Sequence, residues 1–569
     1  MSRTGHYAIL DQLLADGVTK IFGNPGTVEQ GLLDALEDRP GLSYVLTLQE
    51  SIAIYAADAY ARATGGLAVA QIHSSPGLGN ALGAMYQANR GHSPILVLGG
   101  DSGIRYQAME AQMAADLVAM ARPVTKWSTM VQHPTSLLRV LRRAIKIALT
   151  PPMGPVYVCL PQDMLDEINL EEVFATCVPD SRVMPRQEMI DSAAQMLLNA
   201  ARPTIFIGDG VSSSGAQTAL ANVAAALGAD VWGVDGGDLN MSYRNPLWRG
   251  ATGHMFGSHS LPITQSGDVN LIVGTYMLPE VFPELGTIYA DGAKTIHIDM
   301  DTNSIAKNHP VDMGLLGDPK LTLEALSGSI LAARTADQAA KAEAAIAKGT
   351  LERAAELAKA QAAATRGDGK EPGSLYFGHF VKALAQRLPA DALVFDEALT
   401  NSPALTAFLQ PSEPGQFFQT RGGSLGTALA GGLGLQAAHK GRTVVAVSGD
   451  GGAMYVLQAL WSAVRHNLPV KFVICNNRSY RLLQANISQF WTERGITGRP
   501  FPTSFDLSKP ALNFADLAAG FGVSSLRVET IDQIGGAIDQ ALAHDGPFLL
   551  DVSLEGNVHP ENIGAKCGQ

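Results

Sequence analysis

Two segments that follow apolar runs carry oxygen-bearing side chains suited to binding a divalent cation. The run VVAVS leads into Gly449-Asp450-Gly451, and the run KFVIC leads into Asn476-Asn477, with Asn477 27 residues after Asp450. In a strand–helix–strand unit both strands end at the same edge of a parallel sheet, so Asp450 and Asn477 are expected to converge there. A carboxylate and an amide oxygen suit Mg²⁺, which commonly completes its shell with phosphate oxygens and water. The glycines would let backbone amides approach a diphosphate.

Two further titratable residues follow apolar runs in the first third of the chain. Glu50 follows YVLTL, and His73 follows LAVAQI just before a Ser-Ser-Pro-Gly turn. Two interpretations of Glu50 are open: its carboxylate makes a charge-assisted hydrogen bond, or the residue is solvated and begins a helix. His73, with an ordinary imidazole pKa of about 6.5, could exchange protons at working pH.

Alternating apolar runs and helical patterns must position these residues. The runs are TKIFG, YVLTL, AVAQIH, PILVLGG and PVYVCLP, then TIFIGDG, ADVWGVD, VNLIVGT and KTIHIDM, and finally ALVFD, TVVAVSG, KFVICNN and PFLLDVS. This alternation is typical of parallel sheets covered by helices. We therefore predict an α/β protein with three doubly wound parallel-sheet domains.

Changes in composition give the expected domain boundaries. We predict a first domain over 1–180, a middle Rossmann-like domain over 187–332 and a third domain over 367–569. The segment 333–366 is rich in alanine with interspersed Lys and Glu, which favours a solvated helical connector.

Composition excludes several classes of protein. The 569 residues carry a net charge of −12, with 46% hydrophobic and 17% charged residues, which indicates large buried cores and subunit contacts and disfavours nucleic-acid binding. No apolar stretch is long enough to cross a membrane, and the amino-terminal segment has the pattern of an amphipathic helix and not of a signal peptide. Because Cys159, Cys177, Cys475 and Cys567 have no paired or metal-ligand spacing, we expect a reducing, cytoplasmic location.

The GDG and NN motifs at this spacing, within a three-domain chain, resemble the signature of the thiamine diphosphate (ThDP)-dependent decarboxylase and acetohydroxyacid synthase superfamily. Within it the chain is most similar to the benzoylformate decarboxylases. The similar segments are GNPGT at 23–27, LQE at 48–50, IHSSPGLGNALGA from Ile72, and HSP at 92–94.

This resemblance implies ThDP and Mg²⁺ as cofactors and names the domains pyrimidine-binding, middle and diphosphate-binding. Mg²⁺ would be held by Asp450, the Asn477 side chain and the Ser479 carbonyl. The positions that match cofactor contacts are Thr400, Asn401, Gly423, Leu425, Gly449 and Gly451, with Leu425 supporting the aminopyrimidine ring.

The resemblance also assigns roles to residues of the reaction site. Glu50 would hydrogen-bond a ring nitrogen of the aminopyrimidine, while His73 and Thr27 would line the substrate pocket and His73 would transfer protons. His92, before a proline, is expected to be structural.

The family's second pocket histidine has no counterpart in GTYMLPEVFPELG, where Tyr276 and Glu280 are the candidates to replace it and His254 and His259 lie upstream. Leu482 and Asn486 match pocket-lining positions, and Glu493 is either an acid–base group or solvent-facing.

The reaction implied is cleavage of a C–C bond next to a carbonyl, with decarboxylation of a 2-keto acid to an aldehyde as the first hypothesis. The alternatives are a carboligase or acyloin lyase similar to acetolactate synthase or benzaldehyde lyase, and a 2-hydroxyacyl-CoA lyase. A regulatory nucleotide-binding protein is disfavoured because it would not need Glu50. Gly208-Asp209-Gly210 lacks the full GxGxxG pattern, so flavin or nucleotide binding stays open. The resemblance further implies self-association as a dimer of dimers.

Overall fold

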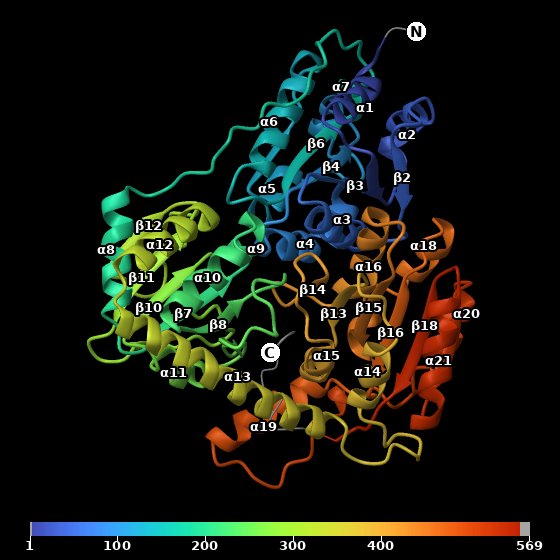
Figure 1. The fold of residues 1–569 in the computed structure, drawn as a ribbon. Helices are drawn as coiled ribbons and strands as arrows, with labels where there is room; N and C mark the ends of the chain where they lie inside the picture. The colour runs from blue at the N-terminus through green and yellow to red at the C-terminus, as the bar shows by residue number, and fades with distance from the viewer. Residues whose placement is uncertain (1–2, 558–569) are drawn as a thin grey trace.

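The structure, a computed structural model, describes residues 3–557 and contains three sheets of six parallel strands (Figure 1). This confirms the predicted α/β class with three parallel-sheet domains. None of the described helices is long and apolar enough to cross a membrane. Cys159, Cys177 and Cys475 are free, and Cys567 lies outside the described residues.

The first sheet has the order β2-β1-β3-β4-β6-β5. Its strands are β1 (Lys20–Gly23), β2 (Ser43–Leu46), β3 (Ala68–His73), β4 (Ile95–Asp101), β5 (Trp127–Met130) and β6 (Val156–Pro161). Because side chains alternate along a strand, Val69, Leu96 and Val158 face one core and Ala70, Val97 and Cys159 another. The first core is covered by α1 (Gly5–Ala15), α2 (Gln30–Glu37) and α6 (Leu137–Leu149). The second core is covered by α3 (Glu50–Thr64), α4 (Ser74–Arg90) and α5 (Leu117–Ala121). The short helix α7 (Gln162–Leu165) follows β6.

The middle sheet has the order β12-β11-β10-β7-β8-β9. Its strands are β7 (Pro203–Gly208), β8 (Asp230–Asp235), β9 (Trp248–Ala251), β10 (Val269–Val273), β11 (Lys294–Asp299) and β12 (Met313–Leu316). The helices are α8 (Gln187–Leu198), α9 (Gly210–Ser214), α10 (Gln217–Leu227), α11 (Gly257–Thr264) and α12 (Pro319–Ala333).

The third sheet has the order β14-β13-β15-β16-β18-β17. Its strands are β13 (Leu393–Glu397), β14 (Phe417–Gln419), β15 (Val444–Gly449), β16 (Lys471–Asn476), β17 (Ser524–Val528) and β18 (Phe548–Ser553). The helices are α14 (Phe377–Ala385), α15 (Ser402–Leu409), α16 (Thr427–Ala438), α17 (Asp450–Ala453), α18 (Ala459–Arg465), α19 (Arg481–Glu493), α20 (Phe514–Gly520) and α21 (Ile531–Ala543).

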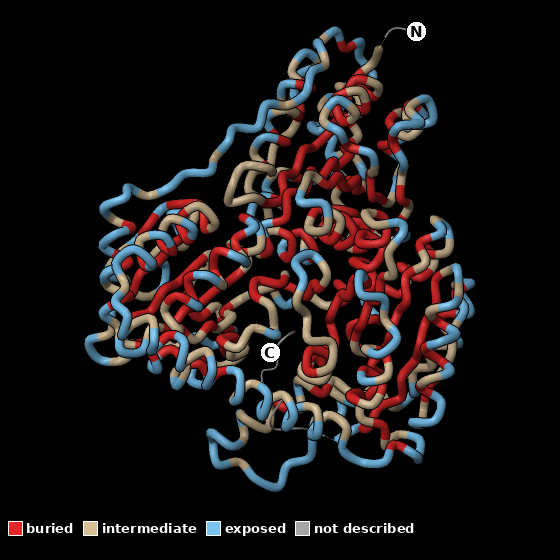
Figure 2. Tube along the Cα trace, in the orientation of Figure 1, coloured by how far each residue is buried: buried red, intermediate tan, exposed pale blue. Residues whose placement is uncertain are grey.

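Helix α13 (Ala336–Ala364) connects the middle and third domains along one side of the molecule (Figure 1). It begins at a capping box formed by Thr335 and Gln338, and it is largely exposed while the strands are buried (Figure 2). Its alanines therefore stabilise the helix through their high helix propensity more than through packing.

The first and third domains share a core through α3 and α16. The two helices approach so closely that a Cβ on Gly434 would lie 2.0 Å from the Ala56 carbonyl oxygen. A glycine is therefore required there, and this contact fixes how the two domains sit against each other.

Candidate active site

Glu50 is held in the first domain by two asparagine amides. The Gln49 side chain caps the start of α3 by accepting from the Ser51 amide at 2.7 Å, which places Glu50 in the first helical turn. Glu50 is 5% exposed, and its two carboxylate oxygens accept from Asn24 Nδ2 at 2.9 Å and Asn80 Nδ2 at 3.0 Å. A buried carboxylate fixed by neutral donors is a well-positioned hydrogen-bond acceptor for a ligand.

His73, at the end of β3, pairs with a carboxylate that sequence reasoning missed. Its Nδ1 lies 2.9 Å from Glu29 Oε2, which also accepts from the Gly26 amide at 2.9 Å. Glu29 is buried, and burial raises its pKa while the neighbouring His73 lowers it. Thr27 is exposed at the start of the short 3₁₀ turn Thr27–Glu29. No local pattern in the sequence indicates Glu29 as the partner of His73.

The expected metal ligands lie on two adjacent strand ends of the third domain. β15 and β16 pair in register up to Gly449 and Cys475, so Asp450 and Asn477 follow neighbouring strands. Asp450 Oδ2 accepts from the Arg478 amide at 2.6 Å, and Asn477 Oδ1 accepts from the Ser479 amide at 3.0 Å. Burial raises the pKa of Asp450 to about 6. A nearby divalent cation would offset that burial, and the carboxylate, amide and carbonyl oxygens fit Mg²⁺.

Two buried acids at the end of β13 position the other predicted cofactor contacts. Glu397 accepts from the Gly426 amide at 2.5 Å and the Ala428 amide at 2.8 Å, which fixes the loop that carries Gly423 and Leu425. Asp396 accepts from the Ala398 amide and from Ser402 Oγ on either side of Thr400 and Asn401. Leu425 and Asn401 are half-buried, Thr400 is buried and Gly423 is exposed. Burial raises the pKa of Glu397 to about 7 and of Asp396 to about 6.

We call Asn24, Thr27, Glu29, Glu50, His73 and Asn80 the first-domain cluster, and Thr400, Asn401, Gly423, Leu425, Asp450, Asn477 and Ser479 the third-domain cluster. The hydrogen bonds described above for Glu29, Glu50 and His73 stay within the first domain, and those of Asp450 and Asn477 stay within the third.

Helix α19 starts two residues after Ser479 and carries the predicted pocket residues Leu482 and Asn486, both half-buried. An ion pair of 2.9 Å between Arg481 Nη1 and Glu555 Oε1 anchors its first turn. Glu493, in its last turn, is exposed and accepts from Gln489 Nε2 at 2.9 Å, as expected for a solvent-facing residue.

Tyr276 and Glu280 have partners outside the two clusters. Tyr276 lies between the Arg90 guanidinium, 5.5 Å from its ring centre, and Lys307 Nζ at 3.9 Å. Glu280 is buried and accepts from Ser260 Oγ at 2.7 Å inside the middle domain. That Tyr276 or Glu280 replaces the missing histidine stays a prediction.

Tyr276 lines a cavity of about 480 Å³ between the first and middle domains. The Gly208-Asp209-Gly210 turn lies at this cavity, but its amides are used internally. The Gly210 amide donates to the Gly274 carbonyl at 2.9 Å, and the Ser212 amide donates to Asn240 Oδ1 at 3.0 Å. The turn therefore offers a diphosphate few free donors.

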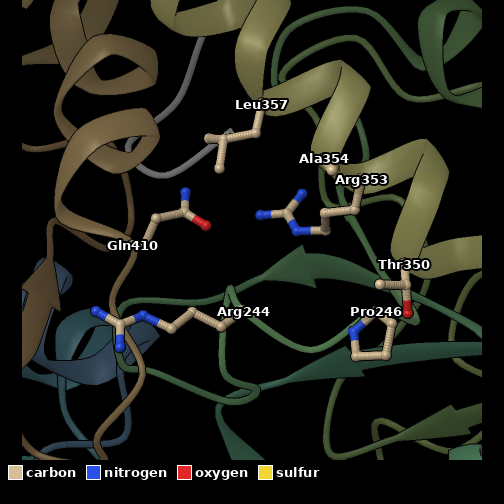
Figure 3. Close-up of a pocket in the computed structure, with 7 residues that line it drawn as sticks. All are labelled: Arg244, Pro246, Thr350, Arg353, Ala354, Leu357 and Gln410. Atoms are coloured by element: carbon tan, nitrogen blue, oxygen red, sulfur yellow. The ribbon is translucent and has the colours of Figure 1, made fainter.

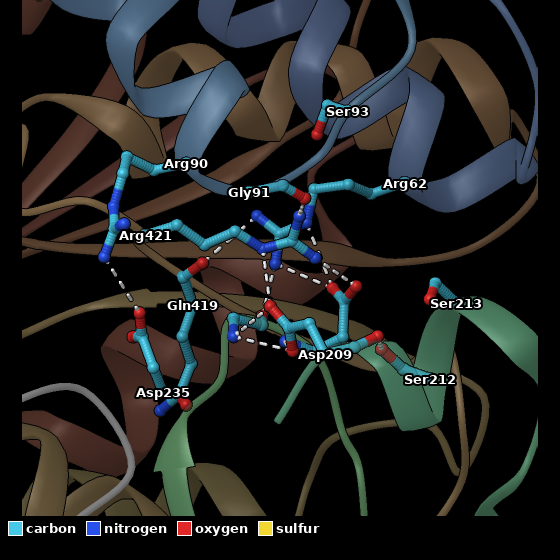
Figure 4. Close-up of polar contacts among 12 residues, drawn as sticks. Arg62, Arg90, Gly91, Ser93, Asp209, Ser212, Ser213, Asp235, Gln419 and Arg421 are labelled. Carbon is cyan, nitrogen blue, oxygen red and sulfur yellow. Dashed lines mark hydrogen bonds and ion pairs between the residues drawn. The ribbon is translucent and has the colours of Figure 1, made fainter. Parts of the chain in front are cut away.

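A charge cluster that lines the cavity joins all three domains (Figure 4). Arg421 of the third domain contacts Asp209 at 2.9 Å and also pairs with Asp238, both of the middle domain. Arg62 of the first domain binds the same Asp238 at 2.7 Å. Although burial raises it, the pKa of Asp238 is held below its usual range by Arg421 and Arg62.

Comparisons with known proteins agree with this layout. Residues 3–120 match the thiamine pyrophosphate enzyme N-terminal TPP binding domain, 190–326 the central domain, and 399–552 the C-terminal TPP binding domain. The chain is 28% identical over 560 residues to benzoylformate decarboxylase of Pseudomonas aeruginosa, covering 97% of this chain and 99% of that protein.

Two other similarities cover nearly the whole chain. It is 28% identical over 555 residues to the acetolactate synthase isozyme 2 large subunit of Escherichia coli K12, covering 96% and 95% of the two chains. The solved structure of the thiamine diphosphate-dependent 4-hydroxybenzoylformate decarboxylase of Rhodococcus jostii RHA1 matches with a TM-score of 0.82 and 26% identity, covering 98% of this chain and 100% of that one.

Proposed function

Because the chain belongs to the thiamine pyrophosphate enzyme family, we propose that this enzyme is a ThDP- and Mg²⁺-dependent carboxy-lyase. It decarboxylates a small 2-keto acid and releases an aldehyde and CO₂. The observation that carries this proposal is the first-domain cluster. In this cluster the buried carboxylate of Glu50 begins α3, and His73, whose imidazole is oriented by the Glu29 carboxylate, ends the next strand, β3.

The third-domain cluster provides the binding groups for the cofactor. Asp450, the Asn477 side chain and the Ser479 carbonyl bind Mg²⁺, while Thr400 and Asn401 contact the diphosphate. Leu425 supports the aminopyrimidine ring. When bound, ThDP supplies the electron sink that makes loss of CO₂ from a 2-keto acid feasible. Glycines 449 and 451 keep the backbone close to the diphosphate.

The first-domain cluster provides proton chemistry. Glu50 accepts a hydrogen bond from the cofactor ring, and Asn24 and Asn80 fix the direction of its carboxylate. His73 moves protons to and from the reacting carbon and oxygen atoms through Nε2, because Nδ1 is engaged by Glu29. The Thr27 hydroxyl places the substrate carboxylate.

We also propose that the enzyme is a cytoplasmic homo-oligomer, a dimer of dimers. Large apolar side chains are exposed on the elements that carry the clusters, among them Leu48, Tyr86 on α4, and Met454 and Tyr455 just after α17. Such a grouping fits a subunit interface. The free cysteines of the protein are consistent with the reducing environment of the cytoplasm.

The test is an assay of the purified protein with ThDP and Mg²⁺ against aromatic, branched and short 2-keto acids, with CO₂, aldehyde and acyloin followed together. We expect CO₂ and aldehyde in equal amounts from at least one acid, and a loss of several orders of magnitude in Glu50→Gln with ThDP binding kept. Acyloin as the main product would assign carboligation instead. Turnover unaffected by Glu50→Gln would contradict the assigned site.

A further inference from the structure

A groove of about 390 Å³ lies where the connector helix meets the middle and third domains (Figure 3). Its main lining residues are Thr350, Arg353 and Leu357 of α13, Arg244 and Pro246 of the loop between β8 and β9, and Gln410 at the end of α15. None of them belongs to the first-domain or third-domain cluster.

The walls of the groove are tied together by backbone contacts. Arg353 Nε donates to the Tyr243 carbonyl at 2.8 Å, and the Tyr243 amide donates to the Pro411 carbonyl at 2.8 Å. A Cβ on Gly349 would lie 2.5 Å from the Pro246 carbonyl oxygen, so α13 touches the loop directly. The groove therefore has a defined shape built from three parts of the chain.

Two guanidinium groups in the groove have no carboxylate within ion-pair distance among the described residues. Arg353 is half-buried, and burial lowers its pKa, with the charge of Arg249 acting in the same direction and that of Glu356 opposing. The neighbouring Arg249, by contrast, pairs with Asp230 at 2.5 Å and Glu352 at 3.1 Å. Arg244 has no ion pair at all in the described part of the chain.

We propose that this groove binds a small oxyanion, a phosphate or carboxylate group, through the guanidinium groups of Arg353 and Arg244. With Nε bonded to Tyr243, the terminal nitrogens of Arg353 stay available, and they extend from α13 toward Gln410 (Figure 3). A planar guanidinium matches a carboxylate or phosphate with two parallel hydrogen bonds. The anion supplies the negative charge that a half-buried, unpaired arginine requires.

An anion bound by Arg353 and Arg244 would connect the connector helix to the middle domain. Because a ligand that binds only the folded chain stabilises it by mass action, saturation should raise the melting temperature. Gln410 ends the helix α15 that begins directly after Thr400 and Asn401, so the groove lies at the opposite end of that helix from the proposed diphosphate contacts.

The probe is inorganic phosphate, titrated at low ionic strength by equilibrium dialysis and thermal unfolding. The full chain is first saturated with ThDP and Mg²⁺ so that the diphosphate site cannot take up the probe. We expect one saturable phosphate per chain and binding at least tenfold weaker in the double variant Arg244→Gln/Arg353→Gln. Lys348→Gln, which removes a positive charge from α13 outside the groove, should bind as the unaltered chain does.

Absence of saturable binding, or equal affinity in the double variant and Lys348→Gln, would overturn the proposal. If the double variant fails to fold, Arg244→Gln alone decides, since that side chain is exposed, and it should weaken binding at least threefold. Acetate, added as a competitor, distinguishes a carboxylate ligand from a phosphate ligand. Displacement of phosphate assigns a carboxylate ligand, and failure to displace it assigns a phosphate.

Discussion

The Glu29–His73 pair shows how a single buried carboxylate can define the role of an imidazole. With Nδ1 engaged by Glu29 at 2.9 Å, only the other ring nitrogen is free to face a substrate, and the ring cannot rotate without losing that contact. Gly26 packs against the ring so closely that a Cβ there would lie 2.1 Å away. The imidazole is therefore held from two sides.

Glu29→Gln tests this orientation. The variant keeps an oxygen for the Gly26 amide but loses the carboxylate, so we expect kcat to fall about 10- to 100-fold with ThDP affinity unchanged. His73→Ala should be at least as severe, and the double variant should be no slower than His73→Ala, because residues in one hydrogen-bonded unit are not additive. If the losses in kcat were additive in steady-state kinetics, the two residues would act independently and Glu29 would have only a structural role.

Asp299 gives the protein a pH dependence of its own. It ends β11 beside the middle-domain cavity, and burial raises its pKa to about 7. Unfolded aspartate loses its proton near pH ~3.9, so between about pH 4 and 7 the folded state binds more protons than the unfolded state. The free energy of unfolding must then fall as pH rises through this window.

Asp299→Asn should remove that contribution. Because Asn Oδ1 can still accept from the Asp301 amide at 2.7 Å, we expect a gain of about 1–2 kcal/mol above pH 7 and none near pH 4. Urea unfolding midpoints at pH 4.5, 6 and 8 check this. Asp180→Asn, an exposed change at the same cavity, serves as the control, and a gain that did not grow with pH would contradict the assignment.

At the scale of elements, the sequence predicted the interior of every sheet and missed most edges. The strands without a matching apolar run are β5, β9, β12, β14 and β17, and each lies at the edge of its sheet. Four of these strands are partly exposed, and the buried strand β14 has only three residues, so none of them needs a long apolar run. β2 was the one predicted edge strand.

The same reasoning explains which parts of the site could be predicted. Asp450 and Asn477 lie on neighbouring strand ends because β15 and β16 pair directly, a consequence of topology that spacing can anticipate. The contact of Glu29 with His73 depends instead on a 3₁₀ turn folding back against β3, and no local pattern encodes it. Asn80, placed on α4 to reach Glu50, is a tertiary contact of the same kind.

Asp450→Ala tests the strand-end site as a unit. In the proposed site the diphosphate contacts the protein partly through Mg²⁺, so we expect Mg²⁺ and ThDP affinity to fall together, at least 100-fold, in calorimetric titrations. EDTA should release ThDP from the unaltered protein. Glu493→Gln, an exposed change in the same domain, should bind both normally. Stoichiometric ThDP retained by purified Asp450→Ala would exclude Asp450 as a ligand.

At the scale of the whole molecule, Asp238 joins the three domains by binding Arg62 and Arg421. Asp238→Asn leaves two buried guanidiniums with Asp58 and Asp209 as their remaining acids, so we expect a loss of about 3 kcal/mol, at the lower end for a broken buried pair. The measurement is the urea midpoint. Asp180→Asn, exposed at the same cavity, is the control, and equal midpoints for the two variants would refute the joining role.

The two clusters lie on different domains of the chain, the first and the third, and this bears on assembly. A C2 dimer can bring the first domain of one chain against the third domain of the other and so form two equivalent sites. Each site would then use Glu50 from one subunit and Asp450 from its partner. The exposed apolar residues on α4 and after α17 are suited to such a contact.

Mixing inactive variants tests this arrangement. When Glu50→Gln and Asp450→Ala chains are mixed equally and allowed to exchange, half of the dimers are mixed, and each mixed dimer has one site without either change. We expect about a quarter of full activity. Glu50→Gln mixed with His73→Ala should recover nothing, because both changes lie on the first domain and every site keeps one of them. Sites built within single chains would give no recovery in either mixture, and an active monomer in sedimentation would exclude the shared site directly.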